Sequence, residues 1–377
     1  MNGELTQPAE KTPPCWLLYG ANGYTGKIIA EEAQRRGMRP LLAGRNREAV
    51  AALAEALGLE YRVFDLASHD EIVSALQDVE VVLHCAGPFT ATSRPMVDAC
   101  ISAGAHYMDI TGEIPVLESL FALHDTAVHA GISIIPGAGF DVVPTDCLAL
   151  SLKEEMPDAT SLRLAFAGKV TQSPGTWRAT LEAIPRCGAI RRDGKLVTVP
   201  HAWRATRIHF DDKPRSVMTI PWGDVSSAWR STRIPNIMVF GGVPRLSIAA
   251  MQLFRGIVCT VMGVPALQRA LKSMVSWFVR GPGERHRKTE VYHLRGDVWN
   301  DRGEHAARFM VTPEGYACTV LTSLAILETL LEGKIAPGVW TPAQAMGSGF
   351  AATLPGFRVM ECADTVPQPG SEYAFDS

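Results

Sequence analysis

The stretch that decides the fold is Cys15-Trp-Leu-Leu-Tyr-Gly-Ala-Asn-Gly-Tyr-Thr-Gly26, followed by a helical pattern from Lys27 to Arg36. An apolar strand, a glycine turn and a helix in this order form the pyrophosphate site of dinucleotide-binding folds. We expect Gly20 to allow the tight turn, Gly23 to let backbone N–H groups approach the phosphates, and Gly26 to let the helix pack close to the strand. The spacing is G-x-x-G-x-x-G rather than G-x-G-x-x-G, so a purely structural turn is the alternative.

The next apolar run, Met38 to Ala43, ends at Gly44-Arg45-Asn46. NAD sites usually place an acid here for the ribose 2′-OH, whereas NADP sites avoid the acid and offer Arg to the 2′-phosphate. Gly44 stands where the acid would be, so Arg45 indicates NADP(H). The alternative is a solvated Arg45 with Asn46 as the N-cap of the following helix, and both interpretations can hold together.

Strand and helix patterns alternate from residue 15 to about 145. This predicts an α/β fold with a Rossmann-type, doubly wound parallel sheet that binds ligands at the carboxyl ends of its strands. After about residue 155 the pattern changes to strands joined by hairpin-type turns at Asp193-Gly194 and Asp301-Arg-Gly303, which predicts a second α+β domain on a mostly antiparallel sheet. The strands expected there are Ser161 to Ala167, Lys195 to Val199, Thr206 to Phe210, Val217 to Ile220, Glu290 to Trp299 and His305 to Val311.

Composition excludes several classes of function. A net charge of −3 gives no support for nucleic-acid binding. The eight cysteines are scattered without C-x-x-C pairs, and the ten histidines show no pairing, so we expect no metal site and a reduced, cytoplasmic protein. The polar, Pro-rich residues 1–14 lack the apolar stretch of a signal peptide and are expected to be a disordered tail.

The stretch from Leu246 to Phe278 is mostly apolar but is interrupted at Arg255 and Pro265, too soon for a membrane-spanning helix. We favour helices packed on the second sheet. Two alternatives are an apolar lid over a greasy substrate and peripheral membrane contact, for which Arg255, Arg269, Lys272 and Arg280 would suit anionic headgroups.

Candidate cofactor ligands follow the ends of the predicted strands. Asp65 is placed to meet the adenine amine, with a turn residue as the alternative. Gly87-Pro88-Phe89 would let the nicotinamide ribose pass, with a tight turn as the alternative.

Candidate chemistry is expected where the last strands of the first sheet end. Asp109, Glu113 and Asp141 could hold the ribose or carboxamide, and a desolvated carboxyl could act as an acid. Asp141 is the preferred active-site carboxylate, whereas Glu113 could instead cap its own helix. Tyr107 could donate a proton, although a tyrosine in a strand is more often part of the core.

Residues of the second domain could contact substrate. Ser173-Pro-Gly175-Thr176 precedes a helical pattern, and such a helix start can bind an anion or a developing enolate oxygen, with ordinary capping as the alternative. Asp224, in Pro-Trp-Gly-Asp, is expected in a turn, where it could form part of the substrate wall.

With these segments placed, the chain resembles the saccharopine dehydrogenase-like oxidoreductases, and is most similar to their bacterial trans-acting enoyl reductase branch. Asn22 stands where Thr is frequent in that family, and Val142-Val143 where Ser-Ile is common. The stretches that carry the resemblance are Gly20-Ala-Asn22-Gly-Tyr24-Thr25-Gly26, Leu42 to Asn46, Gly87-Pro88-Phe89, His106 to Glu113, Gly139 to Asp146, Pro221 to Ser226, Ile234 to Asn236, Gly281-Pro282 and Thr341-Pro342.

The resemblance implies an NADP(H) cofactor and an inserted substrate domain. It also implies C-terminal helices that return to the first domain. We therefore divide the chain into a tail (1–14), an NADP-binding Rossmann domain (15–150), a substrate domain (151–315), the returning helices (316–360) and a second tail (361–377).

The resemblance also implies a reaction. Relatives in lipid biosynthesis reduce a C=C bond on a polyketide-type acyl chain made by a separate synthase, and the name-giving members reduce an imine. We expect an enoyl reductase acting on a hydrophobic acyl substrate. An imine reductase, with Arg178, Arg186, Arg191 and Arg192 available for carboxylates, and a non-catalytic NADP-binding or membrane-associated scaffold are the alternatives. The oligomeric state cannot be inferred from the sequence.

Overall fold

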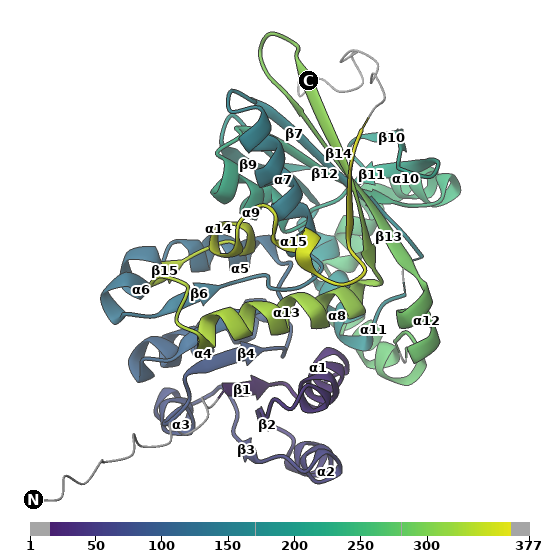
Figure 1. Cartoon of the computed structure of the whole chain (residues 1–377). Helices are drawn as coiled ribbons and strands as arrows, with labels where there is room; N and C mark the ends of the chain where they lie inside the picture. The colour runs from purple at the N-terminus through teal and green to yellow at the C-terminus, as the bar shows by residue number, and fades with distance from the viewer. Residues whose placement is uncertain (1–15, 170, 280, 363–377) are drawn as a thin grey trace, which may run out of the picture.

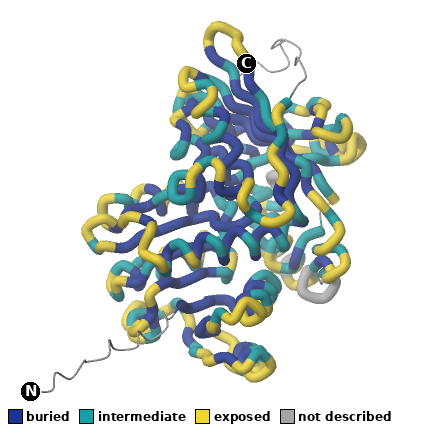
Figure 2. Tube along the Cα trace, in the orientation of Figure 1, coloured by how far each residue is buried: buried dark blue, intermediate teal, exposed yellow. Residues whose placement is uncertain are grey.

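The structure is a computed structural model that describes residues 16–169, 171–279 and 281–362 (Figure 1). The predicted tail 1–14, most of the tail 361–377 and Arg280 lie outside the described residues, as does the side chain of Lys272. Two sheets organise the chain. Each carries helices, and Figure 2 shows that buried residues concentrate along the strands.

The first sheet has seven strands in the order β15-β6-β5-β4-β1-β2-β3, and every neighbouring pair is parallel. Its strands are β1 (Trp16–Tyr19), β2 (Leu41–Gly44), β3 (Tyr61–Val63), β4 (Val81–His84), β5 (His106–Asp109), β6 (Ser133–Ile135) and β15 (Gly338–Val339).

Helices cover both faces of this sheet because successive strand residues point to opposite sides. Leu17 and Leu18 are both fully buried, yet they belong to different hydrophobic clusters. The cluster of Leu18 includes residues of α1, α2, α7 and α13, and that of Leu17 includes residues of α3, α4, α5 and α6. The predicted doubly wound parallel sheet is confirmed. These helices are α1 (Tyr24–Arg35), α2 (Arg47–Leu57), α3 (His69–Ala75), α4 (Phe89–Ala103), α5 (Ile114–Phe121), α6 (His124–Ala130), α7 (Val143–Glu155) and α13 (Gly315–Leu331).

The second sheet has nine strands, with the path β10-β11-β12-β7-β13-β14-β16 and the hairpin β8–β9 attached to β12. All its pairings are antiparallel except β12 with β7, so the mostly antiparallel prediction is confirmed. Its strands are β7 (Ser161–Ala167), β8 (Gly188–Arg192), β9 (Lys195–Val199), β10 (Ala205–His209), β11 (Pro214–Thr219), β12 (Asn236–Gly242), β13 (Val291–Trp299), β14 (His305–Pro313) and β16 (Arg358–Glu361). The strands β8, β12 and β16 are not among those expected from the sequence.

The remaining helices lie beside the second sheet or in the C-terminal segment. They are α8 (Pro174–Ala183), the short 3-10 helix η1 (Ile184–Arg186), α9 (Asp224–Thr232), α10 (Arg245–Met262), α11 (Pro265–Phe278), α12 (Glu284–Thr289), α14 (Pro342–Met346) and α15 (Phe350–Thr353). No helix within the described ranges is long and apolar enough to cross a membrane.

The C-terminal segment returns to both sheets. Helix α13 packs against α1 and β4, β15 extends the first sheet beside β6, and β16 then pairs with β14 at an edge of the second sheet. The division of the chain into domains stays a prediction, but these pairings show that the two sheets are connected repeatedly.

Candidate functional site

The glycine turn between β1 and α1 holds its backbone close to β4. Gly20 has a φ of +81°, and a Cβ on it would lie 2.9 Å from Ala86. A Cβ on Gly26 would lie 2.3 Å from the carbonyl oxygen of Gly20, so only glycine allows α1 to start this close to β1. Gly23 differs, because its Cβ would meet only Gly20 O, at 3.1 Å.

The start of α1 is open to an anion. Gly23 is the N-cap and supplies no side-chain hydrogen bond, so the first N–H groups of the helix are left for a ligand. The helix dipole adds positive potential at the same point. This backbone fits a dinucleotide pyrophosphate.

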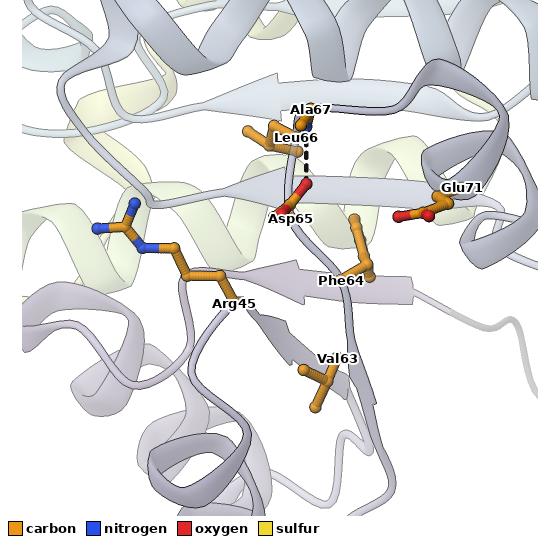
Figure 3. A pocket seen from close by; sticks show the side chains of 7 residues that line it. All are labelled: Arg45, Val63, Phe64, Asp65, Leu66, Ala67 and Glu71. Carbon is orange, nitrogen blue, oxygen red and sulfur yellow. Dashed lines mark hydrogen bonds between the residues drawn. The ribbon is translucent and has the colours of Figure 1, made fainter.

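A pocket of about 670 Å³ lies at the carboxyl ends of β2 and β3 (Figure 3). Asp65 accepts a hydrogen bond from the Ala67 N–H at 2.8 Å, so its carboxylate shapes the loop of the pocket. Arg45 is exposed, and Asn46 caps α2 by accepting from the Ala49 N–H at 3.1 Å. An exposed guanidinium beside such a pocket fits the 2′-phosphate of NADP, and Arg45 stays the predicted ligand for it. Its lining residues are Arg45, Val63, Phe64, Asp65, Leu66, Ala67 and Glu71.

The Gly87-Pro88-Phe89 turn after β4 is held by Glu113. The two carboxylate oxygens of Glu113 accept hydrogen bonds from the N–H groups of Phe89, at 2.8 Å, and Thr90, at 3.1 Å. Glu113 therefore caps α4, which starts at Phe89, and makes no side-chain cap to its own helix α5. Its carboxylate is committed to positioning this turn.

Tyr107 and Asp109 form a buried network with His84. The Tyr107 hydroxyl donates to Asp109 Oδ2 at 2.8 Å and lies 3.1 Å from His84 Nδ1. Asp109 Oδ1 accepts from the N–H groups of Thr111 and Gly137. Burial raises the pKa of Asp109 to about 6, and these hydrogen bonds oppose the rise. Because all three side chains are fully buried, the placement favours the core interpretation of Tyr107.

Asp141 lies where the loop after β6 meets α13. The Phe140 N–H donates to Thr319 Oγ1 at 3.1 Å, which fixes this loop on α13. A Cβ on Gly112 would lie 2.7 Å from Asp141 Oδ2, so a glycine is required beside this carboxyl. Asp141 is partly exposed, yet desolvation by the surrounding protein raises its pKa to about 7. At neutral pH this carboxyl can both hold and release a proton.

Tyr316, which the sequence did not reveal as a site residue, connects α8 to the glycine turn. Its hydroxyl accepts from the Ser173 N–H at 2.7 Å and lies 2.8 Å from Thr176 Oγ1. Its ring packs edge-on against Tyr24, with centroids 4.8 Å apart. Burial raises the pKa of Tyr316, and the charge of Asp141 adds to the rise. The substrate candidate Thr176 therefore lies in one network with the cofactor candidate Tyr24. Tyr316 is the second residue of α13, whose N-cap is Glu314, and this position at a helix start is the sequence signal that could have indicated it.

Gly175 and Thr176 lie in the first turn of α8. Ser173 is the N-cap and accepts from the Thr176 N–H at 3.2 Å, so the capping alternative is realised. Gly175 is exposed, and no atom lies within 4 Å of a Cβ built on it other than Ser173 Oγ.

Asp224 is fully buried at the start of α9. Neither of its carboxylate oxygens meets a donor at hydrogen-bonding geometry among the described residues, although the Thr145 hydroxyl lies close enough to lower its pKa slightly. Desolvation dominates, and together with the charges of Asp146 and Asp141 it holds the pKa of Asp224 well above its usual range.

Hydrogen bonds join Tyr24, at the start of α1, to α12 and to the segment before it. The Tyr24 hydroxyl donates to the carbonyl oxygen of Pro282 at 2.5 Å, and Arg287 Nη1 donates to the Tyr24 hydroxyl at 2.9 Å. Gly281 has a φ of +77°, and a Cβ on it would lie 2.7 Å from the Tyr24 ring. Tyr24 thus contacts Pro282 and Arg287 on one side and Tyr316 of α13 on the other.

The apolar stretch 246–278 forms α10 and α11. Helix α11 packs against α8, which carries Thr176, and α10 packs against η1 and β11. Several large apolar side chains of α10 are exposed rather than turned toward the site. One side of this segment thus packs against the protein, as expected for packed helices, whereas the other side of α10 exposes apolar side chains.

Metal-ligand side chains gather at one place in the described part of the chain, where Asp211, Asp212 and His293 lie within 4.8 Å of one another. His293 Nδ1 is 2.5 Å from Asp211 Oδ1, and Arg215 binds Asp212. These contacts explain why the three side chains lie together, as an ion-pair cluster that includes Arg215.

Comparison with known proteins agrees with this geometry. Residues 16–135 match the saccharopine dehydrogenase NADP-binding domain. A trans-acting enoyl reductase-type protein of Mycobacterium tuberculosis is 34% identical over 184 residues, covering 45% of this chain and 43% of the relative. The human saccharopine dehydrogenase-like oxidoreductase is 29% identical over 199 residues, 46% of each chain. These matches thus span less than half of the relatives' lengths.

Two further comparisons extend over nearly the whole chain. The trans-acting enoyl reductase of Mycobacterium bovis is 26% identical over 408 aligned residues, covering 91% of this chain and 96% of the relative. The solved structure of apo saccharopine dehydrogenase (L-Glu forming) from Saccharomyces cerevisiae superposes with a TM-score of 0.60 at 14% identity, covering 92% of this chain and all of that one. The latter supports the fold alone.

The parallel sheet, the open start of α1 and the match of residues 16–135 define an NADP-binding domain. Residues 16–135 form a saccharopine dehydrogenase NADP-binding domain, and the chain is similar to saccharopine dehydrogenase-like oxidoreductases.

Proposed function

We propose that this protein uses NADPH to reduce the C=C bond of an enoyl group on a hydrophobic acyl substrate, with Asp141 as the proton donor. The observation that carries the proposal is the position of Asp141. Its carboxyl has a pKa of about 7, and its charge acts on Tyr316, whose ring packs against Tyr24 of the glycine turn.

A cluster of aromatic side chains begins at Phe140, the neighbour of Asp141 in the chain, and favours an apolar substrate. Phe140 precedes Asp141 and packs against Tyr292, with ring centroids 4.7 Å apart, and against Phe166, at 5.9 Å. Phe166 in turn packs against Trp222 at 4.8 Å. Such a wall gains about 0.8 kcal/mol for each CH₂ group that it removes from water.

The chain's own groups supply the proton and hold the substrate oxygen. Bound NADPH supplies a hydride for such a reduction. Asp141 holds a proton on a carboxyl oxygen at neutral pH and can release it to the substrate carbon that does not receive hydride. The hydroxyls of Tyr316 and Thr176, ordered by the Ser173 cap, can donate hydrogen bonds to a thioester oxygen as negative charge develops on it.

An imine substrate of the amino-acid type is the second candidate, and it needs cations for its carboxylates. Arg191 is buried and committed, because it pairs with Glu118 and donates to Val225 O at 2.8 Å. Arg192 lies over the Trp203 ring. Arg178 favours this candidate, since it lies on α8, two residues beyond Thr176.

The substrate could be presented by a separate synthase. Relatives from Mycobacterium tuberculosis and Mycobacterium bovis carry the name trans-acting enoyl reductase. We therefore propose that the acyl chain reaches this protein while bound to a separate biosynthetic enzyme or as a free thioester.

Turnover of NADPH with two substrates tests the proposal. The purified protein is given a long-chain 2-enoyl thioester, or an imine formed from an amino acid and an aldehyde, and oxidation of NADPH is followed. We expect turnover with the thioester and loss of that turnover in Asp141→Asn. Turnover with the imine alone would replace the proposal with the second candidate. NADPH binding without turnover of either substrate would favour the scaffold alternative.

A further inference from the structure

Helix α10 carries an exposed apolar stripe. Leu246, Leu253 and Ile257 are 87%, 75% and 63% exposed. Their spacing of seven and four residues places them on one face, which continues to Val261 and Val264. More than half of the exposed large hydrophobic side chains in the described residues belong to α10, α11 and the turn between them. Clustering of this kind marks an interaction surface, whereas single exposed apolar residues need no explanation.

The opposite side of α10 is fastened to the protein. Ile248 is only 7% exposed, and Gln252 Nε2 donates to the carbonyl oxygen of Ala202 at 3.1 Å. On α11, Gln268 Nε2 donates to Leu181 O of α8, also at 3.1 Å. The stripe is therefore the outer side of a docked pair of helices.

The charge of this segment selects the kind of partner. Residues 245–279 contain Arg245, Arg255, Arg269 and Lys272 and no Asp or Glu, although the whole protein carries a net charge of −3. Arg245 and Arg269 are exposed. A second copy of this chain docking here through a two-fold axis would bring like charges together. Anionic headgroups would instead neutralise these cations while the apolar side chains enter the acyl region.

We propose that α10 and α11 dock this protein onto an anionic phospholipid bilayer, with α10 lying in the plane of the interface. The docking goes beyond the proposed reaction and does not depend on it. It has a consequence for that reaction, because α11 packs on α8 and α8 holds the Thr176–Tyr316 network. The docked surface is therefore two helices away from the residues proposed to act on an acyl chain.

Sedimentation with vesicles tests the docking. The full chain is mixed with vesicles of phosphatidylcholine alone or of phosphatidylcholine with phosphatidylglycerol. We expect sedimentation with the anionic vesicles, weaker binding to the neutral ones, and release as salt is raised. The double variant Leu253→Glu, Ile257→Glu should lower the vesicle partition coefficient at least tenfold.

A matched control separates this face from exposed apolar surface in general. Leu196 on β9 is 45% exposed, and Leu196→Glu should bind vesicles like the wild type. Failure of the wild type to sediment, or an equal loss in Leu196→Glu, would overturn the proposal. The proposal would also be overturned if light scattering showed a wild-type dimer that becomes a monomer in the double variant, while neither protein bound vesicles.

The outcome is independent of the reaction. With a short, water-soluble enoyl thioester and no vesicles, the double variant should turn over NADPH as fast as the wild type. Loss of vesicle binding with retained turnover supports docking, whereas binding without turnover in the wild type would leave docking standing and contradict the proposed reaction.

Discussion

Replacing Asp141 with Asn should make the protein more stable and less active at the same time. Desolvation raises the pKa of this carboxyl from 3.8 to about 7, so at pH 8 the folded protein holds an ionised group in surroundings that favour the neutral acid. The favourable contribution of the neutral acid is present in full below pH 3.8 and is lost as pH rises through about 7. Asn is neutral at every pH and avoids that loss.

The size of the gain follows from the shift. About three pKa units at 1.36 kcal/mol each set an upper limit of about 4 kcal/mol at pH 8. Because Asp141 is partly exposed, solvent screening lowers the expected gain to about 1–3 kcal/mol. Urea unfolding of both proteins at pH 8 measures the gain, and the same experiment at pH 3 should show it vanish.

Activity should move in the opposite direction. Loss of a general acid lowers kcat by roughly 10²- to 10⁴-fold. Wild-type kcat should fall as pH rises above 7, and the residual rate of Asp141→Asn should be flat over the same range. Asp70→Asn, at an exposed position in the first turn of α3, is the control and should lower stability by no more than about 1 kcal/mol, the contribution of a carboxylate at a helix N-terminus. Unchanged or reduced stability of Asp141→Asn at pH 8 would refute the assigned environment of this carboxyl.

Three further substitutions test other parts of the structure. Arg45→Ala should weaken NADPH by about 1.5–3 kcal/mol and NADH much less, and equal losses in a fluorescence titration would remove Arg45 from the 2′-phosphate site. Gly23→Val should leave the protein folded by circular dichroism, because a Cβ at this position would meet only Gly20 O. It should abolish NADPH binding, since the side chain would occupy the space of the pyrophosphate, and retained micromolar affinity would contradict this. Asp297→Ala should destabilise the protein by about 3–5 kcal/mol in urea unfolding, since Arg163 and Arg295 would stay buried without their shared carboxylate; a loss under 1 kcal/mol would show that water reaches them.

Local sequence signals predicted the first sheet well because each signal acts over a few residues. The Gly20 turn, the Asn46 cap and the alternating strand and helix patterns all depend on neighbours along the chain. The strand β12 was missed although it is central and buried, since Pro235 precedes it and two glycines end it, which are the marks of a loop.

The candidate site was less predictable because its members come from distant parts of the chain. Asp141 could be proposed from its place after a strand, but its raised pKa depends on the protein that closes around it. Tyr316 contacts Ser173, 143 residues earlier in the chain. Glu113 preceded its own helix in the sequence, yet it caps another helix that tertiary packing brings nearby. Patterns of neighbouring residues carry no information on such contacts between distant parts of the chain.

The late return of the chain to both sheets has a consequence for synthesis on the ribosome. The strand β6 pairs with β15, which is translated about two hundred residues later, and Ser133 donates to the carbonyl oxygens of Ile335 and Ala336. Until then the nascent first half exposes an unpaired edge, a template for wrong pairing with other chains. A chaperone that shields nascent chains should therefore raise the yield of soluble protein. Cutting the gene after β6 should give aggregates rather than a smaller NADP-binding protein.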